Sequence, residues 1–172
     1  FGIIYGLSAH GLMQRQNITR DDAEQLIKNY FEAYPKVNKW KKKIVKNAST
    51  NGFVETLLGR RRYIPNINSQ NKNLQLAAER IAINMPVQGT AADIIKQAMN
   101  DIDRELTDLQ LEGYGSTMLL QIHDELIFDV PEKEIDMITD LAKRFMPSMI
   151  LDVPLIIERK YGKSWGEMKA DA

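Results

Sequence analysis

Apolar residues recur with helical spacing through the first fifty residues of the chain. Residues 1–14 are predicted to form a helix, and Thr19 has the position of an N-cap for a second helix. The apolar stripe expected to face the core of this second helix is Ala23, Leu26, Ile27, Tyr30, Phe31 and Tyr34. A third, lysine-rich helix is predicted after Pro35, and it ends at the turn signal Asn51-Gly52.

The middle of the chain combines a hairpin pattern with a longer helical pattern. Residues 53–64 predict a β-hairpin whose bend lies near Gly59. A helix is expected from about Leu74 onward. Because proline has no backbone N–H and glycine is a poor helix former, we expect an interruption at residues 86–89. The helix is then predicted to restart over 90–109, capped by its first threonine.

The last third of the chain mixes strands with one helix. Residues 117–122 and 126–130 are short apolar strands, and the three residues between them have hairpin spacing. A helix is predicted over 132–146 and a final strand over 153–162. Because helices come first and strands follow, the expected fold class is α+β, mostly helical with a small antiparallel sheet.

Composition narrows the class of protein. The chain has 172 residues, of which 44% are apolar and 27% charged, as in ordinary soluble globular proteins. It has no apolar run near eighteen residues and no visible signal peptide, so no membrane partner is expected. With no cysteine, two histidines, no HExxH and no GxSxG, zinc sites and serine hydrolase chemistry are disfavoured.

The net charge of zero hides an uneven distribution. Residues 1–62 contain 12 Lys and Arg against 5 Asp and Glu, whereas residues 63–172 contain 11 against 18. Most of the excess positive charge lies in "KVNKWKKKIVK" and "GRRRY". Such segments suit contacts to a nucleic acid backbone, although a solvated lysine face is an equally ordinary use.

The tip of the hairpin near residue 124 carries the strongest candidate chemistry. His123, Asp124 and Glu125 stand between the two apolar strands, where Asn-Gly or Asp-Gly would be usual. Adjacent carboxylates repel each other and gain by sharing a divalent cation, and carboxylate oxygens suit Mg²⁺. A simple solvated acidic turn is the alternative.

A polar row follows the helix that begins near Leu74. Arg80, Asn84 and Gln88 lie four residues apart, drifting toward an apolar stripe of Ala77, Ile81 and Met85. Arg, Asn and Gln are the residue types that hydrogen-bond base edges in nucleic acids. Local pairing to neighbouring backbone is the alternative use.

Four stretches together resemble one family. "FGIIYGLS", "TLLGRRRYIPN", "AAERIAINMPVQGTAADIIKQAM" and "LLQIHDELIFDVP" closely resemble the C-terminal polymerase segment of family A DNA polymerases, the bacterial DNA polymerase I type. The resemblance covers essentially the whole chain. It implies template-directed DNA synthesis in replication and repair, with dNTP and primer–template DNA as partners and a cytoplasmic location.

The resemblance also implies roles for individual residues. The incoming nucleotide would be bound by Phe1, Gly2 and Tyr5. Primer–template DNA would be contacted by Arg80, Asn84, Gln88, Gln121 and His123. Asp124 would hold catalytic metal and Glu125 would support it, within a two-metal Mg²⁺ mechanism.

The resemblance further implies that the chain is incomplete. Residues 1–62 would be part of the fingers and residues 63–172 part of the palm. The partner aspartate would lie in an upstream palm motif, and no stretch like "DYSQIELR" is present. The thumb and the remaining palm and fingers would be separate partners, and the chain alone is expected to be inactive. A single-subunit RNA polymerase and a non-catalytic DNA-binding module are the alternatives.

Overall fold

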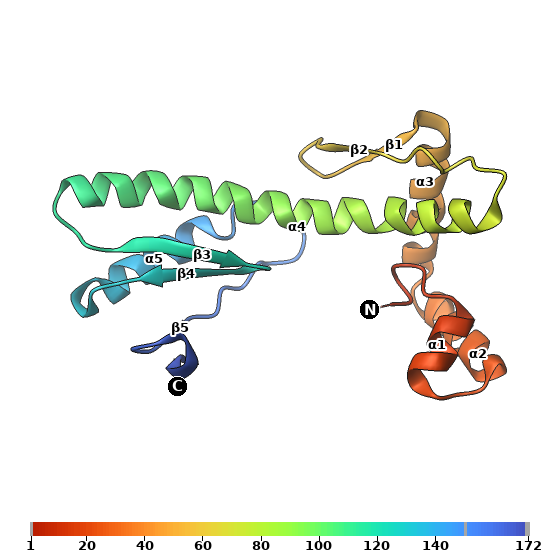
Figure 1. The fold of residues 1–172 in the computed structure, drawn as a ribbon, viewed down its shortest axis with the longest axis horizontal. Coiled ribbons are helices and arrows are strands. Elements are labelled where there is room, and N and C mark those ends of the chain that lie inside the picture. Colours follow the sequence, from red (N-terminus) through yellow and green to blue (C-terminus); the bar gives the residue numbers. More distant parts are fainter. Residues whose placement is uncertain (1, 150, 171–172) are drawn as a thin grey trace. The chain divides into compact units, whose positions relative to one another are not determined.

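The computed structural model describes residues 2–149 and 151–170 (Figure 1). Residues 1–90 and 91–172 form two compact units, and each is described here by itself. The first unit contains α1 (Ala9–Gln16), α2 (Arg20–Ala33), α3 (Pro35–Asn51), β1 (Phe53–Glu55) and β2 (Arg61–Tyr63). One long helix, α4 (Lys72–Leu111), begins in the first unit and ends in the second.

The second unit contains β3 (Thr117–Ile122), β4 (Glu125–Asp129), α5 (Ile135–Phe145), β5 (Lys160–Tyr161) and β6 (Lys169–Ala170). Short 3₁₀ turns occur at Glu132–Glu134 and Trp165–Glu167. In the part of the chain that the structure describes, three two-stranded antiparallel sheets accompany the helices, which confirms the α+β prediction. Within the described ranges, no helix combines the length and apolarity needed to cross a membrane.

The first predicted helix is wrong over its first half. Residues 2–6 form turns, and α1 begins only at Ala9, after Ser8 accepts a hydrogen bond from the N–H of Gly11 (3.2 Å). Gly6 has φ of +86°, which a helix cannot contain and which glycine adopts without strain. The helical pattern of this stretch was therefore misleading, because Gly6 allows a tight turn that the pattern does not reveal.

The next two helices begin and end where the sequence predicts. Thr19 caps α2, accepting a hydrogen bond from the N–H of Asp22 (3.2 Å), and Gly52 ends α3 with φ of +77°. The predicted stripe on α2 is only partly correct, because Ala23 is fully buried while Leu26 is 49% and Tyr34 is 55% exposed.

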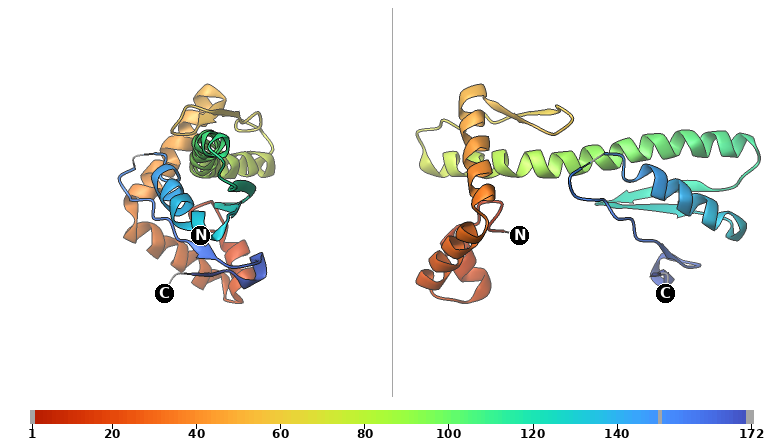
Figure 2. Two further views of the ribbon diagram at one scale, coloured as in Figure 1. Left: turned by 90° about the vertical axis from the view of Figure 1, so that its left-hand side faces the viewer. Right: turned by 180° about the vertical axis from the view of Figure 1, so that it is seen from behind.

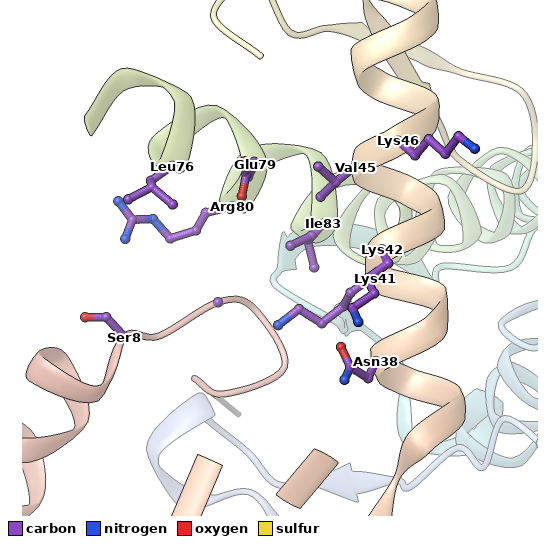
Figure 3. A pocket seen from close by; sticks show the side chains of 11 residues that line it. Ser8, Asn38, Lys41, Lys42, Val45, Lys46, Leu76, Glu79, Arg80 and Ile83 are labelled. Carbon is purple, nitrogen blue, oxygen red and sulfur yellow. The ribbon is translucent and has the colours of Figure 1, made fainter. Parts of the chain in front are cut away.

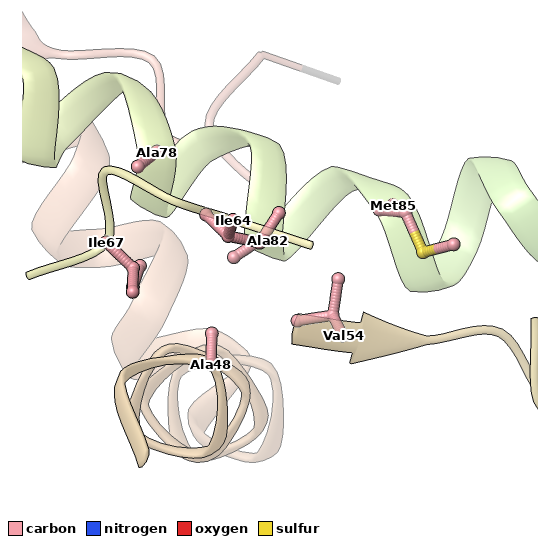
Figure 4. Packing of buried hydrophobic residues seen from close by; sticks show 7 residues of the cluster. All are labelled: Ala48, Val54, Ile64, Ile67, Ala78, Ala82 and Met85. Carbon is pink, nitrogen blue, oxygen red and sulfur yellow. The ribbon is translucent and has the colours of Figure 1, made fainter. Parts of the chain in front are cut away.

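The core of the first unit forms where α3, the β1–β2 hairpin and the first half of α4 meet (Figure 4). Its buried members are Ala48, Val54, Ile64, Ile67, Ala78, Ala82 and Met85. The buried stripe of α4 is thus 78, 82 and 85, whereas 77, 81 and 85 were predicted. Ile81 is 39% exposed. Three members of this core are alanines, at positions 48, 78 and 82, and their small side chains let the backbones of α3 and α4 approach closely.

The predicted break in α4 is also wrong: the helix continues through residues 86–89 (Figure 1, Figure 2). The Thr90 hydroxyl donates to the carbonyl of Pro86 and accepts from the N–H of Leu57 (3.0 Å), so it links helix to hairpin instead of capping a new helix. A Cβ on Gly89 would lie 2.7 Å from Cγ2 of Thr56. Glycine is needed there for close packing, and the helix tolerates it.

The core of the second unit lies between the second half of α4, the β3–β4 hairpin and α5. Ile102, Leu106 and Ile138 are buried at its centre. Met118, Leu126 and Phe128 of the hairpin pack against them. The hairpin and the helix predicted over 132–146 are confirmed, the latter as a 3₁₀ turn followed by α5.

The predicted last strand is mostly absent. Of residues 153–162, only Lys160–Tyr161 forms a strand, paired with Lys169–Ala170. Val153 and Ile156 are 71% and 81% exposed, so the apolar pattern finds neither a strand partner nor a core among the described residues. A strand needs such a partner to satisfy its backbone groups.

We predict that Ile102→Ala destabilises the chain by about 2–5 kcal/mol, because the side chain is fully buried and its removal leaves a cavity. Asn100→Ala, an exposed position on the same helix, is the control and should change stability by about 0.5 kcal/mol or less. Urea denaturation followed by circular dichroism measures both. Equal stability of the two variants would contradict the described face of α4.

Candidate functional site

The β3–β4 hairpin turns over only two residues, His123 and Asp124. Ile122 pairs with Glu125, so Glu125 begins β4 where the sequence predicted a three-residue loop. His123 has φ of +55°, a left-handed conformation that Gly or Asn usually supplies. A histidine there costs about 1–3 kcal/mol of backbone strain. Local turn chemistry therefore does not explain this residue, which points to a function at the tip.

Four residues predicted for the site come together at this tip. The side-chain amide of Gln121 donates to the carbonyl of His123, and Asp124 and Glu125 follow directly. Gln121, His123, Asp124 and Glu125 are all exposed. A cation lies beside these acids, since Nζ of Lys160 is 4.0 Å from Oε1 of Glu125.

The acid pair by itself does not complete a metal site. In residues 2–149 and 151–170, no three His, Asp or Glu side chains lie close enough together to hold an ion. The exposed carboxylates have the oxygen chemistry that Mg²⁺ prefers, so they fit as part of a ligand set. Further ligands would have to come from elsewhere.

A second set of predicted residues meets in the first unit. Arg80, Asn84 and Gln88 are exposed along α4, on successive turns. The side-chain amide of Gln88 donates to the hydroxyl of Tyr5 (3.4 Å), which joins the segment before α1 to α4. The two sets belong to different units, so each is described within its own unit.

The glycines of the first segment have separate roles. A Cβ on Gly6 would lie 3.0 Å from Cγ of Arg80, so this glycine lets the backbone rest against the arginine side chain. Gly2 instead faces Leu7, whose Cδ2 would be 2.9 Å from an added Cβ. Phe1 lies outside the described residues.

Two of the three arginines after Gly59 make contacts within the first unit. The Arg60 guanidinium donates to the carbonyl of Gly89 (2.9 Å), and this bond ties the β1–β2 hairpin to α4. Arg61 pairs with Glu55 (2.7 Å) and stacks over the Phe53 ring at 4.5 Å. Arg62 is exposed.

A cavity of about 470 Å³ adjoins the Gly6–Arg80 contact (Figure 3). It is lined by the segment before α1, by α3 and by the first half of α4. Lys41 and Lys42 point from α3 into it. Burial lowers the pKa of Lys41, whose ammonium lies 4.5 Å from the centre of the Phe31 ring. These lysines were noticed in the sequence only as part of a basic run.

Sequence reasoning missed Glu134, which fixes the start of the hairpin. Glu134 is 2% exposed, and its carboxylate accepts hydrogen bonds from Ser116 Oγ (2.7 Å) and from the N–H groups of Ser116 and Gly115 (3.1 Å each). The Ser116 hydroxyl is the main cause that lowers the pKa of Glu134. Because Thr117 begins β3, this buried carboxylate anchors the strand that leads to Asp124.

We predict that Glu134→Gln lowers stability at neutral pH, because an amide cannot accept all three hydrogen bonds. A lowered folded-state pKa means that the stabilisation by Glu134 is present above the unfolded pKa of about 4.3. It is lost as pH falls through the folded-state pKa, so wild type and variant should converge in acid. Urea midpoints at pH 7, 5 and 3.5 test this.

Glu132→Gln is the matched control for this prediction, since Glu132 is an exposed acid in the same 3₁₀ turn. Its urea midpoint should follow wild type at each pH. A Glu134→Gln midpoint equal to wild type at pH 7 would contradict the anchoring role.

Comparison with known proteins places this chain among DNA polymerases. The model of the family "DNA polymerase family A" matches residues 1–167. DNA polymerase I of Lactococcus lactis subsp. cremoris is 48% identical over 170 residues, covering 98% of this chain and 19% of the relative. The thermostable DNA polymerase I of Thermus filiformis is 45% identical over 172 residues, covering 99% and 20%.

A solved structure agrees with these relatives. The POL domain of Pol1 from M. smegmatis, in complex with DNA primer-template and dNTP, matches with a TM-score of 0.84 and 42% identity. The match covers 90% of this chain and 27% of that one. The chain spans about a fifth of the length of the curated relatives it matches. With a family model matching nearly its whole length, the chain belongs to DNA polymerase family A.

Proposed function

We propose that this chain is a part of a template-directed DNA polymerase that transfers nucleotides from dNTPs to a primer 3′-hydroxyl. The observation that carries the proposal is the β3–β4 tip, where Asp124 and Glu125 are exposed beside a strained His123. Family membership supports it. We assign residues 1–62 to the fingers and 63–172 to the palm, with the thumb and remaining palm and fingers as partners. We also assign a cytoplasmic location on the basis of family membership.

The first set of site residues would bind nucleotide and template. Tyr5 would stack near the template base, and its hydrogen bond to Gln88 would hold the ring in place. Phe1 and Gly2 complete the proposed nucleotide contacts. Arg80, Asn84 and Gln88 would line the primer–template junction, because their exposed side chains lie on successive turns of one helix.

The second set would act at the primer terminus. Gln121 and His123 would contact the primer end, with the hydrogen bond between them keeping the turn fixed. Asp124 would contribute its carboxylate to two Mg²⁺ ions, with Glu125 as the supporting acid. Bound Mg²⁺ supplies charge neutralisation for the reacting phosphate and lowers the pKa of the attacking hydroxyl.

The chain by itself should not catalyse DNA synthesis. A two-metal site needs carboxylates from more than one position, and the described residues bring no third ligand to Asp124 and Glu125. We therefore expect no primer extension by residues 1–172 alone in Mg²⁺. Extension by this chain would contradict the proposal that the partner aspartate lies elsewhere.

Two alternative functions, a non-catalytic DNA-binding module and a single-subunit RNA polymerase, can be distinguished from DNA synthesis. A DNA-binding module without catalysis would keep the contacts of α4 but would have no need of exposed acids at a strained turn. A single-subunit RNA polymerase would incorporate ribonucleotides in preference to deoxyribonucleotides. Family membership favours the DNA polymerase over both.

We predict that Asp124→Asn, made in a full-length polymerase that carries this chain, lowers primer extension by at least about a thousandfold, or 4 kcal/mol. Binding of primer–template DNA should change little. Asp129→Asn is the matched control, because this exposed acid lies at the opposite end of the same hairpin and loses the same charge. Extension is measured on a labelled primer in Mg²⁺.

The outcomes separate the candidate functions. If Asp124→Asn extends as well as Asp129→Asn, Asp124 is only a turn residue and the proposed metal role is wrong. If wild type binds primer–template DNA but does not extend the primer, the non-catalytic DNA-binding function is favoured. Preferential incorporation of ribonucleotides would favour the RNA polymerase.

A further inference from the structure

The β3–β4 hairpin that carries Asp124 has a register that its own strands specify weakly. Every residue of both strands is half-buried or exposed, and Leu119 and Leu120 are 56% and 49% exposed. A register is strongly specified where one face of a strand pair is buried, because a shift by one residue exchanges the two faces. A face that is only partly buried excludes a shifted pairing less strictly.

Two local features weaken the register further. The turn residues, His123 and Asp124, are not the Asn-Gly or Asp-Gly pairs that fix a two-residue hairpin. The register also shifts between Met118 and Leu120, so that Leu119 stands opposite no residue of β4. If β3 held this extra residue at another position, different residues would form the turn.

The open end of the hairpin is clamped by Glu134. Ser116 directly precedes β3 and Glu134 follows β4. The Glu134 carboxylate accepts hydrogen bonds from the Ser116 hydroxyl and from the N–H groups of Ser116 and Gly115. Glu134 and Ser116 are 2% and 1% exposed. A Cβ on Gly115 would lie 3.2 Å from Cγ of Pro131, so the two chain segments also pack closely. Three hydrogen bonds to one buried carboxylate fix the alignment of these two segments.

We propose that Glu134 is a positioning residue for DNA synthesis, because its clamp sets the β3–β4 register that places Asp124 in the turn. The inference rests on the proposed function for the role of Asp124. In the observed register Ile122 pairs with Glu125, and Asp124 lies at the tip. A shift by one residue would move Asp124 out of the turn or direct its carboxylate to the other face of the hairpin. Glu134 itself is buried, so it acts on the proposed metal ligand through the strand pairing.

The register is tested with an engineered disulfide, which this chain allows because it has no cysteine of its own. Thr117 and Asp129 are partners in the observed register. Cα atoms of facing antiparallel residues lie about 4.5–5.5 Å apart, within the range of a disulfide. Residues 1–172 carrying Thr117→Cys/Asp129→Cys should therefore cross-link readily with oxidised glutathione. Adding Glu134→Gln should slow cross-linking at least about fivefold, because a shifted register puts the two Cβ atoms on opposite faces.

Glu132→Gln in the same double-cysteine chain is the matched control, since Glu132 is an exposed acid of the same 3₁₀ turn. Its cross-linking rate should equal that of the parent double-cysteine chain. The rate is measured from the loss of free thiols and from the faster migration of the cross-linked chain in a non-reducing gel.

The effect on synthesis is tested in a full-length polymerase that carries this chain and whose other cysteines, where it has any, are changed to serine. Glu134→Gln should lower kcat for primer extension at least about tenfold, because misplacing a catalytic group by about 1 Å can cost a hundredfold. Its Kd for primer–template DNA should stay within about twofold of wild type, since the lost interaction is one of positioning and not of binding. Circular dichroism at the assay temperature checks that each variant is folded.

Rescue by the disulfide separates positioning from a loss of stability. Glu134→Gln with the oxidised Thr117→Cys/Asp129→Cys bond should recover the kcat of the oxidised double-cysteine polymerase, because the bond replaces the clamp. Reduction of the bond should remove this recovery. The double-cysteine polymerase with Glu134 intact should extend equally well in both redox states.

Three results would overturn the inference. One is an equal cross-linking rate in Glu134→Gln and Glu132→Gln, and another is an equal kcat in these two variants. The third is a loss of kcat that the oxidised bond does not restore, which would leave Glu134 a role in stability alone. Because cross-linking needs no synthesis, it decides the register even where the full-length wild type extends no primer. That last result would refute the proposed function and the positioning role that rests on it, but not the clamp.

Discussion

The continuity of α4 across Pro86 is the constraint on which the polar row of Arg80, Asn84 and Gln88 depends. Proline within a helix costs about 3 kcal/mol, because it removes a hydrogen bond and crowds the preceding turn. Here Thr90 donates to the Pro86 carbonyl, and the same residue binds the backbone of the β1–β2 hairpin. Arg60 adds a bond to Gly89. The hairpin thus stabilises the helix at the point where its sequence is weakest.

That continuity sets the positions of the polar row. Arg80, Asn84 and Gln88 share one side of α4 only while each lies four residues from the next on an unbroken helix. Gln88 itself falls inside the stretch where a break was predicted, and a break there would have turned its side chain away from Tyr5. Helix continuity, though it looks purely structural, is therefore what brings Gln88 to the hydroxyl of Tyr5.

The sequence predicted the elements well wherever a local signal decides them. The cap at Thr19, the stop at Gly52 and the β3–β4 hairpin are confirmed, since each depends on a few neighbouring residues. The errors arose where distant residues decide. Gly89 reads locally as a helix breaker, but its small size is required by Thr56, thirty-three positions earlier. The strand predicted over 153–162 fails for the same reason, because strands depend on partners that no local pattern reveals.

The candidate site shows the same division between local and distant causes. Asp124 and Glu125 drew attention in the sequence because an acid pair without glycine is unusual at a hairpin bend, and His123 has the left-handed φ that glycine would usually supply there. Glu134 was not recognised from the sequence, because an acid near the start of a helix is ordinary and only its burial against Ser116 distinguishes it.

The two units also differ in the charged side chains that they gather. Exposed acids gather at the tip of the β3–β4 hairpin, whereas Lys41 and Lys42 of α3 line the cavity beside Arg80. The zero net charge of the chain is thus the sum of a positive excess in residues 1–62 and a negative excess in residues 63–172.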